Sequence, residues 1–124
     1  QVYAKMLGEQ IATHNSRGYL INTGWSGGPY GVGKRISLPY TRRLVQAALT
    51  GEIEQSQFVA DPIFGIEVPK ECKGVPSEIL WPKNTWQDKD AYDKQAKNLA
   101  QRFIANMDKI ATVAAEIKAA GPKI

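Results

Sequence analysis

Apolar residues recur at helical spacing near both ends of the chain. Residues 2–14 place apolar side chains three or four positions apart along one face, which predicts an amphipathic helix. In the last third, successive apolar residues are separated by four, three, four, four and three positions, which predicts one long helix with Thr85 or Asp88 as its N-cap. We expect this helix to bury Tyr92, Ala96, Leu99, Phe103, Met107 and Ile110. A further helical stretch through Ile117 should end at Gly121.

Between these helices the chain carries three short apolar runs bounded by turn-forming residues. They predict short strands at 18–22, 57–60 and 63–68, the last two separated by Asp61-Pro62. We therefore expect a mixed α/β structure with short strands and a long C-terminal helix, formed by residues 1–124 as a single segment.

A further helix is predicted at 40–50, because an apolar stripe recurs there at helical spacing and Gly51 stands where a C-terminal cap would. Pro39 is suited to the start of this helix. Residues 69–87 contain several prolines and a glycine, which indicates an irregular segment crossing the surface.

The main functional candidate is a glycine-rich stretch at 24–33, which holds five of the eleven glycines of the chain. Residues 28–34 match the phosphate-loop pattern G-x-x-x-x-G-K, but Arg35 occupies the next position, where a phosphate loop needs a hydroxyl for Mg²⁺. A phosphate loop also leads directly into a helix, and here Pro39 intervenes. We therefore interpret the match to a phosphate loop as coincidental.

The segment after this glycine-rich stretch has the chemistry of an adenine-binding wall. Adenine needs an apolar or planar surface for its face and polar groups for its edge. Ile36 offers apolar contact, Arg35 a guanidinium that can stack, and Thr41 a hydroxyl. On the residues alone, a strand end followed by a helix cap remains the simpler interpretation.

Composition and charge exclude or disfavour several kinds of partner and site. The net charge is +4, but the 16 lysines and arginines form no dense run, which disfavours a nucleic-acid partner. Cys72 is the only cysteine, so an internal disulfide and a multi-thiolate metal site are excluded. No apolar run approaches the length of a membrane span and no signal-peptide pattern opens the chain, so we expect a cytoplasmic protein without a membrane partner.

His14 and the acids at Asp88, Asp90 and Asp93 fit helix-end charges better than catalytic or metal-binding groups.

Two features of the chain ends suggest that this sequence is part of a longer protein. The chain opens on an amphipathic segment without an initiator methionine, and it closes on a glycine and a proline that can end a helix. We expect the beginning to be truncated and the end to be natural.

Several stretches resemble the ATP-dependent phosphoenolpyruvate carboxykinase family, in the order and spacing of that family. They are residues 3–8 (YAKMLG), 20–25 (LINTGW), 33–37 (GKRIS), 61–65 (DPIFG), 76–80 (PSEIL), 82–86 (PKNTW) and 120–123 (AGPK). The resemblance covers nearly the whole chain and implies the C-terminal part of the nucleotide-binding domain of a considerably longer enzyme.

The resemblance also implies a function. Enzymes of this family convert oxaloacetate and ATP to phosphoenolpyruvate, CO₂ and ADP, with Mg²⁺ and Mn²⁺ bound. The family's adenine contacts fall on Arg35, Ile36 and Thr41. Its phosphate loop, metal ligands, catalytic lysines and oxaloacetate-binding arginine lie upstream, in the N-terminal part that this chain lacks. We therefore expect no catalytic or metal-binding residue here and no activity from the chain alone.

Two alternatives stay open at this point. One is a self-contained nucleotide-binding or protein-interaction module without catalysis. The other, an independent phosphate-loop kinase, is opposed by Arg35 at the position of the Mg²⁺-binding hydroxyl.

Overall fold

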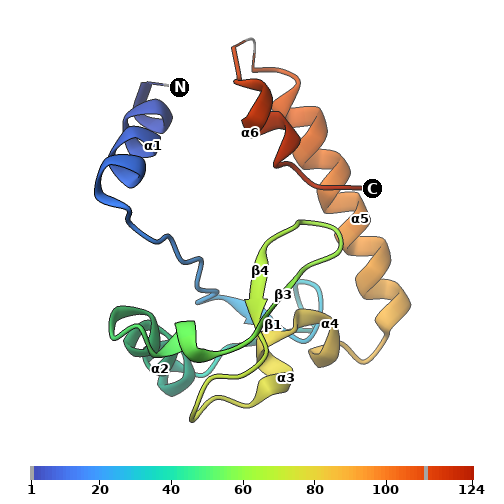
Figure 1. Cartoon of the computed structure of the whole chain (residues 1–124). Coiled ribbons are helices and arrows are strands. Elements are labelled where there is room, and N and C mark those ends of the chain that lie inside the picture. Colours follow the sequence, from blue (N-terminus) through green and yellow to red (C-terminus); the bar gives the residue numbers. More distant parts are fainter. Residues whose placement is uncertain (1, 111) are drawn as a thin grey trace.

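The computed structural model describes residues 2–110 and 112–124, and it shows a mixed α/β arrangement (Figure 1). The helices are α1 (Val2–His14), α2 (Leu38–Leu49), the 3-10 helix η1 (Glu52–Gln55), α3 (Ser77–Leu80), α4 (Pro82–Thr85), α5 (Lys89–Met107) and α6 (Ala115–Ala119). The strands form two antiparallel pairs, β1 (Trp25–Ser26) with β2 (Lys34–Arg35) and β3 (Phe58–Ala60) with β4 (Glu67–Pro69). The mixed α/β class predicted from the sequence is confirmed. In Figure 1 the strands and short helices lie together, while α1 and the α5–α6 pair extend away on opposite sides.

The second hairpin corrects one predicted strand. Asp61 follows β3, and its Oδ1 accepts hydrogen bonds from the main-chain N–H groups of Ile63 (2.9 Å) and Phe64 (2.7 Å). These N–H groups are therefore unavailable to a strand ladder, and the chain turns back through Gly65 at a φ of 67°. The predicted strand at 63–68 is wrong over its first four residues, because β4 begins only at Glu67.

The predicted strand at 18–22 is also wrong, since the structure gives that segment no regular secondary structure. A strand needs a neighbouring strand, and no backbone hydrogen bond joins these residues to another segment within the described chain. Side chains tether the segment to η1: the Tyr19 hydroxyl donates to Glu54 Oε1 at 2.9 Å, and Arg17 pairs with Glu54 Oε2 at 2.5 Å.

The central helix α2 begins two residues before the predicted helix at 40–50 and ends one residue before its predicted end. Pro39 lies in its first turn, and Gly51 follows it in the left-handed conformation, with a φ of 72°. Against α2 packs a small core of Ala47, Ile53, Cys72 and Val75, with Tyr40, Leu44, Phe58 and Leu80 partly buried around it. The segment predicted to be irregular contributes Cys72, Val75 and Leu80 to this region, and part of it forms the single-turn helices α3 and α4.

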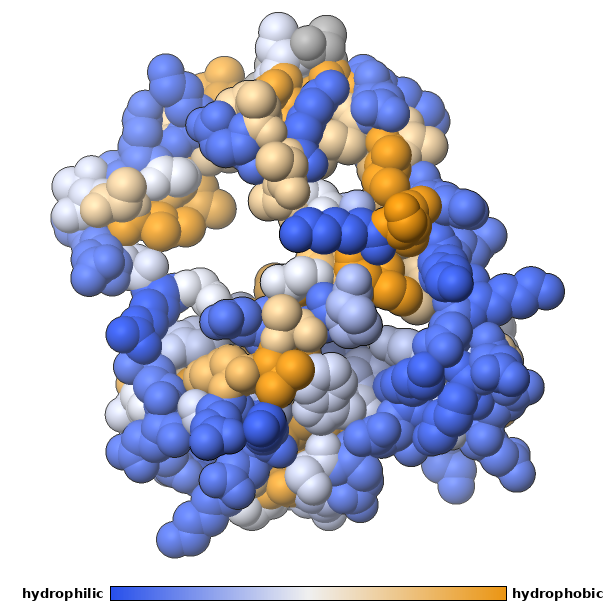
Figure 2. Space-filling view, turned by 45° about the vertical axis from the view of Figure 1, so that its right-hand side comes forward, coloured by the Kyte–Doolittle hydropathy of each residue, from blue (hydrophilic) through white to orange (hydrophobic). Residues whose placement is uncertain are grey.

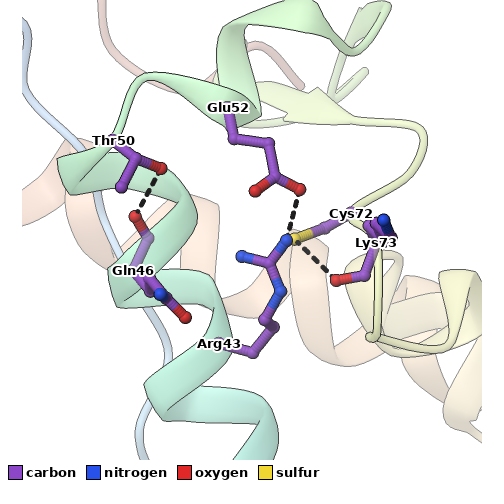
Figure 3. Close-up of polar contacts among 6 residues, drawn as sticks. All are labelled: Arg43, Gln46, Thr50, Glu52, Cys72 and Lys73. Carbon is purple, nitrogen blue, oxygen red and sulfur yellow. Dashed lines mark hydrogen bonds and ion pairs between the residues drawn. The ribbon is translucent and has the colours of Figure 1, made fainter.

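One ion pair borders this core. The Arg43 guanidinium on α2 pairs with the Glu52 carboxylate on η1, next to the buried Cys72 (Figure 3). Burial raises the pKa of the Cys72 thiol, and although Arg43 opposes the rise, Glu52 adds to it. The thiol therefore belongs to the packing of the core and is not set up as a reactive group.

The long helix α5 starts at a well-formed junction. Asp88 caps it by accepting a hydrogen bond from the Ala91 N–H at 2.9 Å. Lys83 on α4 pairs with Asp93 at 2.6 Å, and the ammonium of Lys89 donates to three carbonyl oxygens at the end of α4, those of Lys83, Asn84 and Trp86. These contacts fix α4 against the start of α5.

The buried face of α5 differs from the prediction. Of the six residues expected inside, only Ala96 is buried, Tyr92, Met107 and Ile110 are half-buried, and Leu99 and Phe103 are exposed. Ile110 also lies beyond the end of the helix. Leu99 and Phe103 are exposed because few neighbours in the described chain pack against them. Phe103 contacts Phe64 of the second hairpin edge-on, with ring centroids 6.3 Å apart, but this single ring contact leaves more than half of the Phe103 surface exposed. None of the described helices combines the length and the apolar character needed to span a membrane.

Reactivity of Cys72 tests this core. Because the thiolate is the reactive form and burial raises the pKa of this thiol, alkylation by iodoacetamide at pH 8 should be at least about tenfold slower in the native protein than in urea. Mass spectrometry of the peptide that carries Cys72 gives the rate, and the pH of half-maximal rate should be higher in the native protein than in urea, because burial raises the pKa of the thiol. Equal native and unfolded rates would contradict a buried thiol.

Candidate functional site

The β1–β2 hairpin positions the residues that the sequence marks as functional. Trp25 pairs with Arg35 and Ser26 with Lys34, and the Ile36 N–H extends the ladder by donating to the Gly24 carbonyl at 2.8 Å. The glycine-rich stretch forms the loop that joins the two strands.

This loop is closed so tightly that only glycine fits at its base. A Cβ on Gly33 would lie 2.7 Å from the Gly28 carbonyl oxygen and 2.9 Å from that of Ser26, both of them backbone atoms. The Pro29 carbonyl accepts hydrogen bonds from the N–H groups of Val32 and Gly33, each at 3.0 Å. The loop is therefore held closed by two of its own backbone hydrogen bonds.

The same geometry differs from a phosphate loop in two respects. A phosphate loop joins a strand to a helix and directs its N–H groups at a ligand. Here the loop joins two antiparallel strands, and the N–H groups of Val32 and Gly33 are bonded within it. Lys34 lies in β2, beyond the turn.

A hydroxyl pair attaches the hairpin to α4. The Thr85 hydroxyl donates to the Pro82 carbonyl at 2.7 Å, so at the 3.0 Å contact between Ser26 Oγ and Thr85 Oγ1 the hydrogen comes from Ser26. The face of the hairpin that carries Ser26 and Lys34 is therefore the face turned toward α4.

Strand alternation places Arg35 and Ile36 on opposite faces of the hairpin. Ile36 and Ser26 both line a cavity of about 930 Å³, whose wall is mostly apolar and includes Leu44, Phe58 and Val68. Arg35 is exposed beside Trp25 on the other face. The structure therefore does not bring these two predicted side chains onto one surface.

The backbone of Arg35 is nevertheless well placed for a ligand. The backbone of Ile36 and of Lys34 forms hydrogen bonds across to the first strand of the hairpin, so the pair of Trp25 and Arg35 between them is of the non-hydrogen-bonded type. The N–H and C=O of Arg35 therefore point away from β1, to the outer edge of β2. Thr41 lies half-buried in the first turn of α2, where its N–H donates to the Ser37 carbonyl at 3.1 Å.

Sequence reasoning missed the aromatic neighbours of Arg35. Trp25 stands directly opposite Arg35, and the Tyr30 ring meets Trp25 edge-on, with centroids 6.5 Å apart and planes at 72°. Both rings are exposed. Only the register of the hairpin reveals that Trp25 lies opposite this guanidinium-bearing residue.

Metal ligands do not gather anywhere in residues 2–110 and 112–124, where no group of three or more His, Cys, Asp or Glu side chains could hold an ion. Within these ranges the chain therefore offers no cluster of carboxylates that would fit a Mg²⁺ or Mn²⁺ ion. The acids at the start of α5 are occupied otherwise, Asp88 as the helix cap and Asp93 in the ion pair with Lys83.

Comparison with known proteins decides the family. The family model described as phosphoenolpyruvate carboxykinase, in its ATP-using form, matches residues 1–78. The chain belongs to the ATP-dependent phosphoenolpyruvate carboxykinase family. The phosphoenolpyruvate carboxykinase (ATP) of Caldanaerobacter subterraneus subsp. tengcongensis is 62% identical over 122 residues, which cover 98% of this chain and 23% of that protein.

Two other carboxykinases show the same pattern. Phosphoenolpyruvate carboxykinase (ATP) 2 of Moorella thermoacetica is 56% identical over the whole chain and 24% of its own length. The phosphoenolpyruvate carboxykinase (ATP) of Thermus thermophilus is 56% identical over 98% of the chain and 23% of its own length. The chain thus spans about a quarter of the length of these carboxykinases.

The closure of the glycine loop can be tested by adding one methyl group. Gly33→Ala forces a Cβ against two backbone carbonyls, so the unfolding free energy of the protein carrying this chain should fall by about 1–3 kcal/mol. Gly8→Ala is the matched control, because an added methyl there meets nothing within 4 Å and helix α1 gains a better helix former. Urea denaturation measures both, and equal stabilities would mean that the loop is not closed as described.

Proposed function

We propose that this chain is part of an enzyme that converts oxaloacetate and ATP to phosphoenolpyruvate, CO₂ and ADP, and that it supplies part of the adenine-binding wall. The observation that carries the proposal is membership of the ATP-dependent carboxykinase family across nearly the whole chain. The same assignment makes the protein a cytoplasmic carboxy-lyase, and the chain a part of its nucleotide-binding domain.

The adenine contacts combine backbone and side-chain groups. The outward N–H and C=O of Arg35 offer a donor and an acceptor to the polar edge of the base, and its guanidinium can cover one face. Ile36 gives apolar contact and Thr41 a hydroxyl. Because Arg35 and Ile36 point to opposite sides of the hairpin, the base would lie across the outer edge of β2, where both residues can be reached.

In this proposal the chain contributes positioning and no chemical step. Phosphoryl transfer depends on holding the phosphates in line and stabilising their charge, so a fixed adenine restricts where the phosphates can lie. The phosphates, the oxaloacetate, and the Mg²⁺ and Mn²⁺ ions would be bound by the remainder of the longer polypeptide. The chain alone would therefore be inactive.

A self-contained module is supported less well. Such a module must bury its own apolar surface, yet in the described part of the chain no large side chain is fully buried. The apolar face of α1 is open to solvent, and so are Leu99 and Phe103 on α5.

Substitution of Arg35 tests the adenine assignment. In the full-length enzyme, Arg35→Ala should raise the KM for ATP about tenfold, since it removes a face and charge contact at the base, and should leave the KM for oxaloacetate unchanged. Arg42→Ala is the matched control, because Arg42 is an exposed arginine in the first turns of α2. Steady-state kinetics would contradict the assignment if only the KM for oxaloacetate changed.

A further inference from the structure

The β1–β2 hairpin approaches α4 closely at two adjacent residues, and in both cases the group that it meets belongs to Thr85. At Ser26 the contact joins two hydroxyls, with Ser26 Oγ 3.0 Å from Thr85 Oγ1. At Gly27 the contact is with the main chain, because a Cβ added there would lie only 3.3 Å from the Thr85 carbonyl oxygen. Gly27 also has a φ of 84°, which favours glycine. The hairpin is therefore fitted against this one residue of α4.

The Thr85 hydroxyl has a fixed direction. Its hydrogen is used in the 2.7 Å bond to the Pro82 carbonyl at the start of α4, so its oxygen accepts from Ser26. Ser26 in turn pairs with Lys34 across the hairpin, and Lys34 immediately precedes Arg35. The contact with Thr85 thus lies one residue along the ladder from the pair that contains Arg35.

Polar contacts hold α4 itself in place. The Lys89 ammonium donates to three carbonyl oxygens at the end of α4, at 2.7 to 2.8 Å. The Trp86 ring, directly after α4, meets Tyr92 of α5 edge-on, with ring centroids 5.5 Å apart. Figure 2 shows that the side of the molecule formed by α5 is largely hydrophilic, which agrees with a junction held by polar contacts. Thr85 therefore gives the hairpin a fixed support.

We propose that Thr85 is a positioning residue for the adenine site. Through Ser26 it fixes β2 relative to α4, so that the outward N–H and C=O of Arg35 stay in reach of the polar edge of the base. Thr85 acts through the hairpin and not by touching the nucleotide. The inference rests on the proposed function in one respect, that Arg35 contacts the adenine.

Steady-state kinetics of the full-length enzyme tests this role. Thr85→Val keeps the branched shape but removes the acceptor, so the KM for ATP should rise about threefold to tenfold while the KM for oxaloacetate stays unchanged. Thr85→Ser keeps the hydroxyl and should stay within about twofold of the native KM for ATP. Thr50→Val is the matched control, because the Thr50 hydroxyl donates to the Gln46 carbonyl at 2.9 Å, at the end of α2.

A lower melting temperature of Thr85→Val with an unchanged KM for ATP would show that Thr85 serves stability alone, and it would overturn the proposal. So would an equal rise of that KM in Thr85→Ser, because the effect would then not depend on the hydroxyl.

A double-mutant cycle approaches the same contact from the hairpin side. Ser26→Ala removes the donor and should raise the KM for ATP by a similar factor. Because both substitutions remove the same hydrogen bond, Ser26→Ala combined with Thr85→Val should raise it no further than the larger single effect. Factors that multiply in the double variant would contradict a joint action through this contact.

Hydrogen–deuterium exchange gives a readout that needs no ATP. The Ile36 N–H donates to the Gly24 carbonyl at 2.8 Å and closes the hairpin ladder. In the full-length protein, Thr85→Val should speed the exchange of this amide at least about fivefold relative to Thr50→Val, because a hairpin without its anchor opens more often. Unchanged exchange would contradict the anchoring.

The two readouts separate this inference from the proposed function. An enzyme that uses ATP, with a KM for ATP that Thr85→Val leaves unchanged, defeats this inference alone. Faster exchange at Ile36 in a protein that does not use ATP defeats the proposed function alone.

Discussion

The contact between the two ends of the glycine-rich loop determines the geometry of the candidate site. Gly33 lies so close to the carbonyls of Gly28 and Ser26 that a methyl group would collide with both. That approach sets the register in which Trp25 faces Arg35. The register in turn directs the backbone of Arg35 to an open edge, places its side chain on the exposed face, and turns Ile36 toward the cavity.

The hairpin keeps this geometry because it is attached to the rest of the chain at a few defined points. The Ser26 and Thr85 hydroxyls join it to α4, and α4 is fixed to α5 by Lys83, Lys89 and the cap at Asp88. On its other side, the chain runs from Ile36 directly into α2 and the small core. The candidate residues thus lie on a short, rigid connection between two anchored elements, a suitable arrangement for holding a base in one position.

The parts of the fold that depend on local sequence were predictable, and those that depend on distant neighbours were not. The extent of α2 follows from its own periodicity, with Pro39 and Gly51 at its ends. The segment at 18–22 has the composition of a strand, but a strand exists only beside a partner. The buried face of α5 likewise depends on what packs against it, so Leu99 and Phe103 are exposed despite ideal spacing.

In the candidate site, too, the residue types could be recognised from the sequence, whereas their directions and neighbours could not. Residue chemistry marked Arg35, Ile36 and Thr41 as a possible adenine wall, which stays a prediction, and the missing hydroxyl was sufficient to doubt a phosphate loop. Their opposite directions, and the aromatic rings beside Arg35, follow from a hairpin register that the sequence does not state. Asp61 is an intermediate case, because an Asp-Pro pair indicates a turn. Only the hydrogen bonds from the N–H groups of Ile63 and Phe64 to its side chain show that the turn replaces the first four residues of the predicted strand.

Photolabelling with 8-azido-ATP tests most directly whether this chain forms part of the adenine site. The azide sits on the base, so activation by light marks the residues beside the adenine of the nucleotide bound to the full-length protein. The account predicts that labelled peptides include residues 35–41 and that excess ATP abolishes their labelling. ATP-competed labelling confined to peptides outside this chain would contradict it.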